Sequence, residues 1–421
     1  MTTISEETKA FNLRQFRPIP LVRNSERSSF LTCPAQWNWR WNEGLVPAME
    51  KQDARWFGSM WHLVWATVYT PPGKDGFVRT ITKPEEIHQL WDDLTKNTYT
   101  TISCDKYFGE DDEKEFYDAV KLGHFMIDGQ LRQWNLDPQF EVIMPEQRFR
   151  ANVPFNTRQQ KQPLNHWTRL GYSRGANSGG YIALLVGTFD MPVFDHASGK
   201  PIPKILDWKT TNKRNNAKQM NKDNQTGTYM AISTMVLRSM GLIQKDQSCE
   251  EMIFSYARKA LPPDPEKVDD QGRIRNQPTI KDLQNALLCH NFDEDELKGL
   301  KKEQLDVLAR TAGLKVYGEI SKNQGAPLFW REVVRRNKAN RLRQISRIAD
   351  DAEAMAAVRA GVSPVLKAPG EHCNWCDFSD LCDIDEDGGD VADFKKQMFK
   401  FEDPYKDHQE GAENSKNESG G

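Results

Sequence analysis

The sequence predicts a folded α/β protein, and three observations support this fold class. Apolar runs of strand length recur between turn-forming residues, and longer stretches show the 3.6-residue apolar period of helices. Hydrophobic residues make up 38% of the chain, with 12 Trp and 20 Phe, which favours a folded protein over a disordered one. A chain of 421 residues is long enough to bury a large core, in one domain with an added lobe or in two domains.

The sequence also indicates the cellular compartment in which the protein is expected. No apolar run approaches the ~18–20 residues of a membrane helix, and Met1–Glu7 lacks the basic and apolar regions of a signal peptide. Seven cysteines in such a chain indicate metal binding or free thiols more than disulfides. We therefore expect a cytoplasmic protein. The net charge of −3 by itself does not indicate a nucleic-acid partner.

The N-terminal part predicts a flexible segment, residues 1–24, followed by a helical lobe at 25–140. Helices are expected on either side of Cys33-Pro34, because proline is tolerated at the first position of a helix. Another apolar helix covers Arg55–Trp65 and carries His62. On the sequence alone, a single histidine on an apolar helix is more often a core residue than a metal ligand.

Strand patterns define a core that we place at 141–260. Glu141–Phe149 is predicted as a first strand, and Met252–Tyr256 as a later one. Between them, Tyr181–Phe189 and Ile202–Trp208 flank a turn-rich connector, so we expect these two runs to pair as a β-hairpin.

Acidic side chains lie at the ends of these strands. Side chains alternate along a strand, so Asp207 and Lys209 would share one face, and Asp190 would end the neighbouring strand. Two carboxylates and one ammonium would then meet, with Glu146 nearby. Paired carboxylates bind hard divalent cations, although an Asp-x-Lys pair is also common as a solvated pair on a strand face.

A helix is predicted from Asn224 to Met240, with Gly241 as its C-cap. Gln225 and Tyr229 are four residues apart and therefore lie on one helical face. The polar loop at 210–216 suits a phosphate backbone, but it is equally ordinary as a solvated surface.

The C-terminal half begins with a predicted linker and helical insertion at 261–328, which includes an amphipathic helix over Leu300–Ala312. Phe329–Arg347 is strongly basic and predicted as a helix. Helical spacing would place Arg336 and Arg343 near one side, as a track for DNA or as a solvated helix face.

Three cysteines follow within the segment 329–382, spaced Cys373-x2-Cys376-x5-Cys382. This spacing is a strong metal signal, because a CxxC turn lets two thiolates share one centre. The acidic tail at 383–421 is expected to be disordered. No phosphate loop of the GxxxxGK[S/T] type occurs, so no ATP-driven motor is predicted.

Taken in chain order, these motifs resemble the PD-(D/E)XK nuclease superfamily, and within it the RecB-like branch that includes the CRISPR-associated Cas-four-type iron–sulfur exonucleases. The resemblance covers residues 25–260 and 329–382. Its motifs are the histidine His62, the acid Asp190, the D/E-x-K core Asp207-Trp208-Lys209, the QxxxY pair Gln225 and Tyr229, and Cys33 with the three later cysteines.

The resemblance implies a restriction-endonuclease-like core, a central mixed sheet flanked by helices. His62, Asp190 and Asp207 would hold Mg²⁺ or Mn²⁺, and Lys209 would position or deprotonate the attacking water. Gln225 and Tyr229, with Arg336 and Arg343, would contact the substrate. Four thiolates, those of Cys33, Cys373, Cys376 and Cys382, would hold a [4Fe–4S] cluster that staples the N- and C-terminal regions. A zinc ion has the same ligand count.

As a function, the resemblance implies a metal-dependent DNA exonuclease acting on single strands or DNA ends in recombination, repair or phage DNA processing. It would work in the cytoplasm of a bacterial or phage-infected cell, with recombination or helicase proteins, or further copies of itself, as partners. Two alternatives stay open at this point. One is a catalytically weak DNA-binding accessory protein with the same fold, and the other is a structural adaptor built on the cysteine site.

Overall fold

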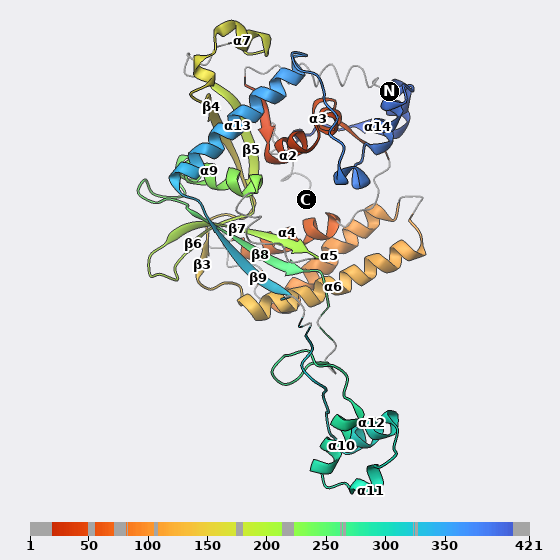
Figure 1. Cartoon of the computed structure of the whole chain (residues 1–421). Coiled ribbons are helices and arrows are strands. Elements are labelled where there is room, and N and C mark those ends of the chain that lie inside the picture. Colours follow the sequence, from red (N-terminus) through yellow and green to blue (C-terminus); the bar gives the residue numbers. More distant parts are fainter. Residues whose placement is uncertain are drawn as a thin grey trace.

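A mixed five-stranded sheet with helices on both faces forms the centre of the fold (Figure 1). Its strand order is β3-β6-β7-β8-β9. The central strands β7 and β8 run parallel, and the other neighbours are antiparallel. The strands cover Phe140–Val142 (β3), Met191–Asp195 (β6), Ile202–Thr211 (β7), Glu251–Arg258 (β8) and Phe329–Arg335 (β9). The computed structural model describes residues 19–48, 55–70, 81, 83–104, 108–173, 180–212, 223–261, 263, 267–322, 324 and 327–406.

Three helices cover one face of this sheet: α4 (Arg55–Tyr69), α5 (Pro84–Ile102) and α6 (Glu110–Trp134). Leu206 and Trp208 of β7 are fully buried against them, as expected for alternate residues of a central strand. Among the helices in the part of the chain that the structure describes, none is long and apolar enough to cross a membrane.

The opposite face is covered by α9 (Asn224–Ser239) and α13 (Lys338–Arg359), which contact each other. Both begin at capping side chains, since Asp223 accepts a hydrogen bond from the Thr226 N–H at 2.7 Å and Asn337 caps α13 in the same way. Ile205 of β7 packs on this face. The alternation predicted from the sequence is therefore confirmed for β7, and so are the helix at 224–240 and the strand at 252–256.

A second sheet of three strands has the order β1-β5-β4, with β1 at Leu21–Arg23, β5 at Tyr181–Phe189 and β4 at Gln147–Pro154. The predicted hairpin between Tyr181–Phe189 and Ile202–Trp208 is therefore wrong. The chain continues through Asp190 into β6, and β6 pairs with β7. The short apolar run next to the turn is the true hairpin partner, because a hairpin turn pairs the strands that directly flank it.

The single strand predicted at Glu141–Phe149 is also wrong, because the structure divides it between β3 and β4 in different sheets. Pro145 cannot donate a backbone hydrogen bond, and Glu146 has a left-handed backbone with φ of 48°. These two residues end the first strand and turn the chain toward the second. The turn brings Glu146 beside the end of β5, where its N–H donates to the Asp190 carbonyl at 2.7 Å.

The prediction of one basic helix over Phe329–Arg347 is wrong for its first half, which is a strand. Its first residues form β9, with Trp330 and Val334 buried on one face, and α13 begins only at Lys338. Aromatic and β-branched residues favour a strand packed on a core, and that burial outweighs the helical spacing of the arginines. Arg336 lies before the helix begins, so helical spacing does not place it beside Arg343.

The prediction of a single helical lobe at 25–140 is wrong, because the N-terminal helices lie on both sides of the central sheet. Helices α2 (Asn24–Thr32) and α3 (Pro34–Trp37) do lie on either side of Cys33, as predicted, but α2 packs against α9 and α13, on the opposite side of the sheet from α4. Residues 21–23, predicted as flexible, form β1 beside β5.

The predicted disorder of 383–421 is wrong for 383–406. After α14 (Ser379–Glu386), the chain forms α15 (Val391–Met398) and β10 (Phe399–Phe401), and β10 pairs antiparallel with β2 (Leu45–Pro47). Phe399 anchors this end by stacking on Phe378 at 5.3 Å between ring centroids. Buried aromatic residues thus order a segment whose composition is mostly polar. Residues 407–421 lie outside the described part of the chain.

A small helical lobe lies between β8 and β9, at α10 (Ile280–Cys289), α11 (Glu294–Leu297) and α12 (Lys302–Thr311). Figure 1 shows it projecting away from the two sheets. It has a hydrophobic core of its own, formed by Leu283, Leu287, Leu297, Leu305 and Ala309. The helix predicted at Leu300–Ala312 is confirmed.

Candidate metal centre and active site

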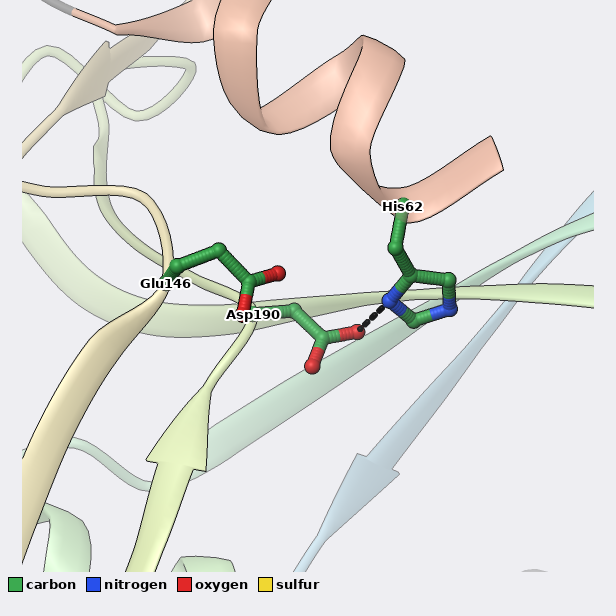
Figure 2. A group of neighbouring side chains, drawn as sticks. All are labelled: His62, Glu146 and Asp190. Carbon is green, nitrogen blue, oxygen red and sulfur yellow. Dashed lines mark ion pairs between the residues drawn. The ribbon is translucent and has the colours of Figure 1, made fainter. Parts of the chain in front are cut away.

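Three side chains from separate elements converge beside the central sheet (Figure 2). His62 comes from α4, Glu146 from the turn after β3, and Asp190 from the bend between β5 and β6. One ligand atom from each lies within 4.8 Å of the others, and His62 Nδ1 is 3.1 Å from Asp190 Oδ2. An imidazole and two carboxylates are donors that suit a divalent cation.

The fold holds these residues by backbone contacts as well as by side chains. The Glu146 N–H donates to the Asp190 carbonyl, and the Trp208 N–H lies 3.3 Å from Asp190 Oδ2. His62 meets the Trp208 ring edge-on at 6.2 Å. Asp190 is therefore tied both to Glu146 and to the strand that carries Asp207.

Asp207 is fully buried on β7, and Lys209 Nζ lies 2.5 Å from its Oδ1. Its other oxygen, Oδ2, has no hydrogen-bond partner among the described residues. A buried carboxylate oxygen without a partner is costly unless something else, such as a cation, satisfies it. Asp190 and Asp207, which the sequence predicted to meet, are electrostatic neighbours in the fold.

The protonation of this group reflects its burial. Burial first, and then the negative charge of Asp190, raise the pKa of Asp207 to about 7. Burial also acts to raise the pKa of Asp190, but His62 and Lys209 outweigh it and lower that pKa. For His62, the Asp190 carboxylate overcomes burial and raises the pKa above its ordinary value. A carboxylate this hard to ionise in the bare protein fits a site whose charge is completed by a divalent cation.

The predicted QxxxY pair lies next to the acids. Tyr229 is nearly buried on α9, with its ring edge-on to Phe149 and Phe189. Burial first, and then the negative charge of Asp190, raise the pKa of Tyr229. Gln225, one turn earlier on α9, partly offsets this rise in the pKa of Tyr229.

The two predicted DNA-contacting arginines lie in different settings. Arg343 is exposed on α13, whereas Arg336 is only 9% exposed and donates to the Asp223 carbonyl at 3.1 Å. Asp223 caps α9, so Arg336 braces the start of the helix that carries Gln225. Residues 213–216 of the predicted basic loop lie outside the described part of the chain.

Glu146 is the site residue on which sequence reasoning placed little weight. The sequence placed it within the predicted strand Glu141–Phe149 that leads toward the other acids, and that was its signal. Nothing in the local sequence shows that this strand end lies beside Asp190, because β3 and β4 belong to different sheets.

The structure brings the four predicted cysteine ligands into one region. Cys33, Cys376 and Cys382 pack at the edge of an aromatic cluster that includes Trp39 and Phe378, and Cys373 is exposed. Burial, together with the neighbouring Cys33 thiol, raises the pKa of both Cys376 and Cys382. Within the described residues, no three of these sulfurs lie within 4.8 Å of one another.

Two comparisons with known proteins bear on this geometry. The family model described as PD-(D/E)XK nuclease superfamily matches residues 25–383, which is most of the chain and includes every site residue described above. A search of curated proteins finds no match.

Proposed function

The chain belongs to the PD-(D/E)XK nuclease superfamily, and on that premise we propose that it is a divalent-metal-dependent exonuclease that hydrolyses DNA. The observation that carries this proposal is the convergence of His62, Glu146 and Asp190 beside the buried Asp207–Lys209 pair. We further propose that it acts on single strands or DNA ends in recombination, repair or phage DNA processing, in the cytoplasm.

Asp190, Asp207 and His62 would hold Mg²⁺ or Mn²⁺, and Glu146 is added to this set by its position. The bound ion would lower the pKa of a water ligand and stabilise charge on the phosphate. Asp207 and Asp190 overcome the effect of burial and raise the pKa of Lys209, so its side chain stays an ammonium. A charged Lys209 can position the water and stabilise developing negative charge, but it cannot remove a proton. The raised pKa therefore favours the first role.

Substrate contacts would come from the α9 side of the site. Tyr229, whose ring packs against Phe189 directly before Asp190, and Gln225, one turn earlier on α9, would orient the strand being cut. The exposed Arg343 would contact the DNA backbone, as a guanidinium does with phosphates. Arg336, which is nearly buried, would support the substrate site through its hydrogen bond to the start of α9.

Replacing Lys209 by Met tests the proposed reaction. We expect the parent to degrade end-labelled linear DNA with Mg²⁺ or Mn²⁺ and to spare circular single strands, which have no ends. Lys209→Met should lower the rate about a hundredfold or more, because it removes a charge aimed at the reacting phosphate. The measurement is product formation on linear single-stranded, linear double-stranded and circular DNA.

Lys204→Met is the matched control, since Lys204 lies on the same strand and also forms ion pairs, with Asp195 at 2.8 Å and Glu251 at 2.7 Å. It should keep its activity per folded molecule, with folding followed by circular dichroism. Binding of DNA without cleavage by the parent would instead support the accessory-protein alternative. Cleavage of circular DNA would contradict the exonuclease mode.

The pH dependence of stability tests the charge state of the site. Folding raises the pKa of Asp207 from 3.8 to about 7, so its stabilising contribution is complete below about pH 4 and is lost as pH rises through 7. His62, whose pKa is also raised, loses its contribution in the same direction. Asp190 has a lowered pKa, so its stabilising contribution is present above about pH 4 and is lost only below it.

We therefore expect the melting temperature of the metal-free protein to fall from pH 6 to pH 8, and to fall less in Asp207→Asn. Mg²⁺ should raise the melting temperature more at pH 8 than at pH 6, because the ion binds the ionised carboxylate. Scanning calorimetry at both pH values measures this. An equal effect of Mg²⁺ at the two pH values would contradict the assigned protonation.

For the cysteines, we propose a [4Fe–4S] cluster held by Cys33, Cys373, Cys376 and Cys382. Four thiolates around one zinc ion have the same ligand count, and the resemblance to the iron–sulfur branch of this superfamily is the reason for preferring the cluster. The donors are thiolates, the usual ligands of iron–sulfur clusters, and one comes from the N-terminal region while three come from the C-terminal region.

Cys376→Ser should abolish the visible absorbance and iron content of anaerobically purified protein. It should also lower the melting temperature by about 5 °C, since the cluster joins distant segments of the chain. Cys104→Ser is the control, because Cys104 is an exposed thiol just after α5, and its replacement should change neither quantity. Colourless parent protein with one zinc ion per chain at these cysteines would contradict the cluster.

A further inference from the structure

A pair of histidines on two adjacent helices forms a second cluster, separate from the nuclease residues. His88 of α5 and His124 of α6 face each other, with their Nδ1 atoms 2.8 Å apart and their rings stacked at 5.0 Å. Each Nε2 atom meets an aspartate of the opposite helix, His88 with Asp128 at 2.9 Å and His124 with Asp92 at 2.8 Å. Each helix contributes one His-x3-Asp unit, so the two halves of the cluster mirror each other.

The hydrogen-bonding roles of these rings follow from their carboxylate partners. An ionised carboxylate can only accept, so each Nε2 facing an aspartate carries a hydrogen. In a neutral ring, the other nitrogen, Nδ1, then has a lone pair and no hydrogen. Two lone pairs cannot face each other at 2.8 Å without a cation between them. The cluster therefore holds either a shared proton, which makes one ring an imidazolium, or a metal ion.

Charge balance favours a divalent ion over the proton. Two neutral imidazoles and two aspartates carry a charge of −2, which a proton reduces to −1 and a divalent ion cancels. A metal-bound histidine commonly donates its other ring hydrogen to a carboxylate, which fixes its orientation and raises its basicity. Asp92 and Asp128 occupy that position for both rings.

The geometry needs little adjustment to accept such an ion. Zinc binds imidazole nitrogen at ~2.0–2.1 Å, which separates two nitrogens of a tetrahedral site by roughly 3.3 Å. The Nδ1 atoms would have to open by about 0.5 Å from 2.8 Å. The histidine side chains are 25% and 32% exposed, so they have room to rotate and solvent can reach the pair.

We propose that His88 and His124 bind a zinc-type transition-metal dication through their Nδ1 atoms, with water as the remaining ligands and Asp92 and Asp128 as orienting carboxylates. Two imidazole donors select zinc, nickel or copper over magnesium, so this site is chemically distinct from the nuclease centre. Binding releases the shared proton to solvent. The ion would join α5 to α6. Because α6 lies against β8 and β9, the ion would stabilise the helical layer on that face of the central sheet.

Zinc content after equilibrium dialysis tests the proposal on the full chain. The buffer holds excess Mg²⁺ to fill the nuclease centre, and the free Zn²⁺ concentration is set by a chelator. The parent should bind one zinc ion more per chain than His88→Gln or His124→Gln, whatever the cysteines hold, since these are unchanged. With Cu²⁺ as a probe, electron paramagnetic resonance should show two coordinated nitrogens in the parent and fewer in either variant.

His196→Gln is the matched control, because His196 also bonds a carboxylate, Glu141 at 2.8 Å, but faces no second histidine among the described residues. It should bind as much zinc as the parent. Asp92→Asn and Asp128→Asn should each weaken zinc binding about tenfold. The proposal is overturned if the histidine variants bind as much zinc as the parent, or if His196→Gln loses as much as they do. Aspartate variants of unchanged affinity would overturn the orienting role.

Discussion

Replacing Asp207 by Asn is expected to reduce DNA cleavage on the order of a thousandfold, the largest activity loss that this structure predicts. The carboxylate is fully buried, and its Oδ2 atom has no partner among the described residues. An amide keeps the shape of the side chain but cannot carry the charge that balances a divalent ion. Loss of several kcal/mol of charge stabilisation corresponds to about a thousandfold in rate.

The same variant should not unfold the protein. Asp207 is a buried carboxylate whose ionisation is unfavourable in the metal-free fold, so Asn at this position should leave the metal-free melting temperature equal or higher at pH 8. Rates of cleavage and calorimetric Mg²⁺ titrations are the measurements. Asp195→Asn serves as the control, because Asp195 is a paired acid at the hairpin end of the neighbouring strand. Asp207→Asn protein that cleaves at the parental rate would refute the assigned centre.

Replacing Asp137 by Asn is expected to lower the free energy of unfolding by about 3 kcal/mol, the largest stability loss that we predict. Asp137 is buried after α6, and both of its oxygens accept from the Arg331 guanidinium of β9 at 2.6 and 2.7 Å. Tyr69 of α4 donates to the same carboxylate at 2.8 Å. Without the negative charge, the Arg331 guanidinium, whose side chain is 11% exposed, has no ion-pair partner among the residues that the structure describes.

Asn is the informative replacement because Asp137 has a left-handed backbone with φ of 50°, which Asn tolerates. The loss therefore measures the charge rather than backbone strain. Urea unfolding at 25 °C measures it, and the double variant with Arg331→Met should lose less than the sum of the single losses. Asp306→Ala removes an exposed ion pair with Arg310 and should cost less than about 0.5 kcal/mol. Equal losses for Asp137→Asn and Asp306→Ala would contradict the argument.

The element types were largely predictable because they depend on neighbours in the sequence. The helix that carries Gln225 and Tyr229 begins and ends close to its predicted limits, since its apolar period and the glycine after it are local signals. The run Tyr181–Phe189 is a strand with the predicted limits for the same reason. Where local signals conflicted, as at Phe329–Arg347, burial of Trp330 decided the outcome.

Pairing was less predictable, because it depends on segments far apart in the chain. The bend at Asp190 sends β5 and β6 into different sheets, and the apolar pattern runs through it almost without interruption. Glu146 joins the site only because β3 and β4 divide at Pro145 in the same region. Arg331 lies within the basic run Phe329–Arg347, but it pairs with Asp137 and is therefore not available to bind DNA.

The sequence by itself determined the acids, the lysine and the cysteines available for chemistry, and the strands and helices that carry most of them. Only the tertiary structure decided which of these side chains meet, including Glu146 with Asp190 and His88 with His124. The physical reason is the distance along the chain over which each kind of interaction acts. Backbone periodicity and capping act over a few residues, whereas burial and charge pairing act between any segments that the folded chain brings into contact.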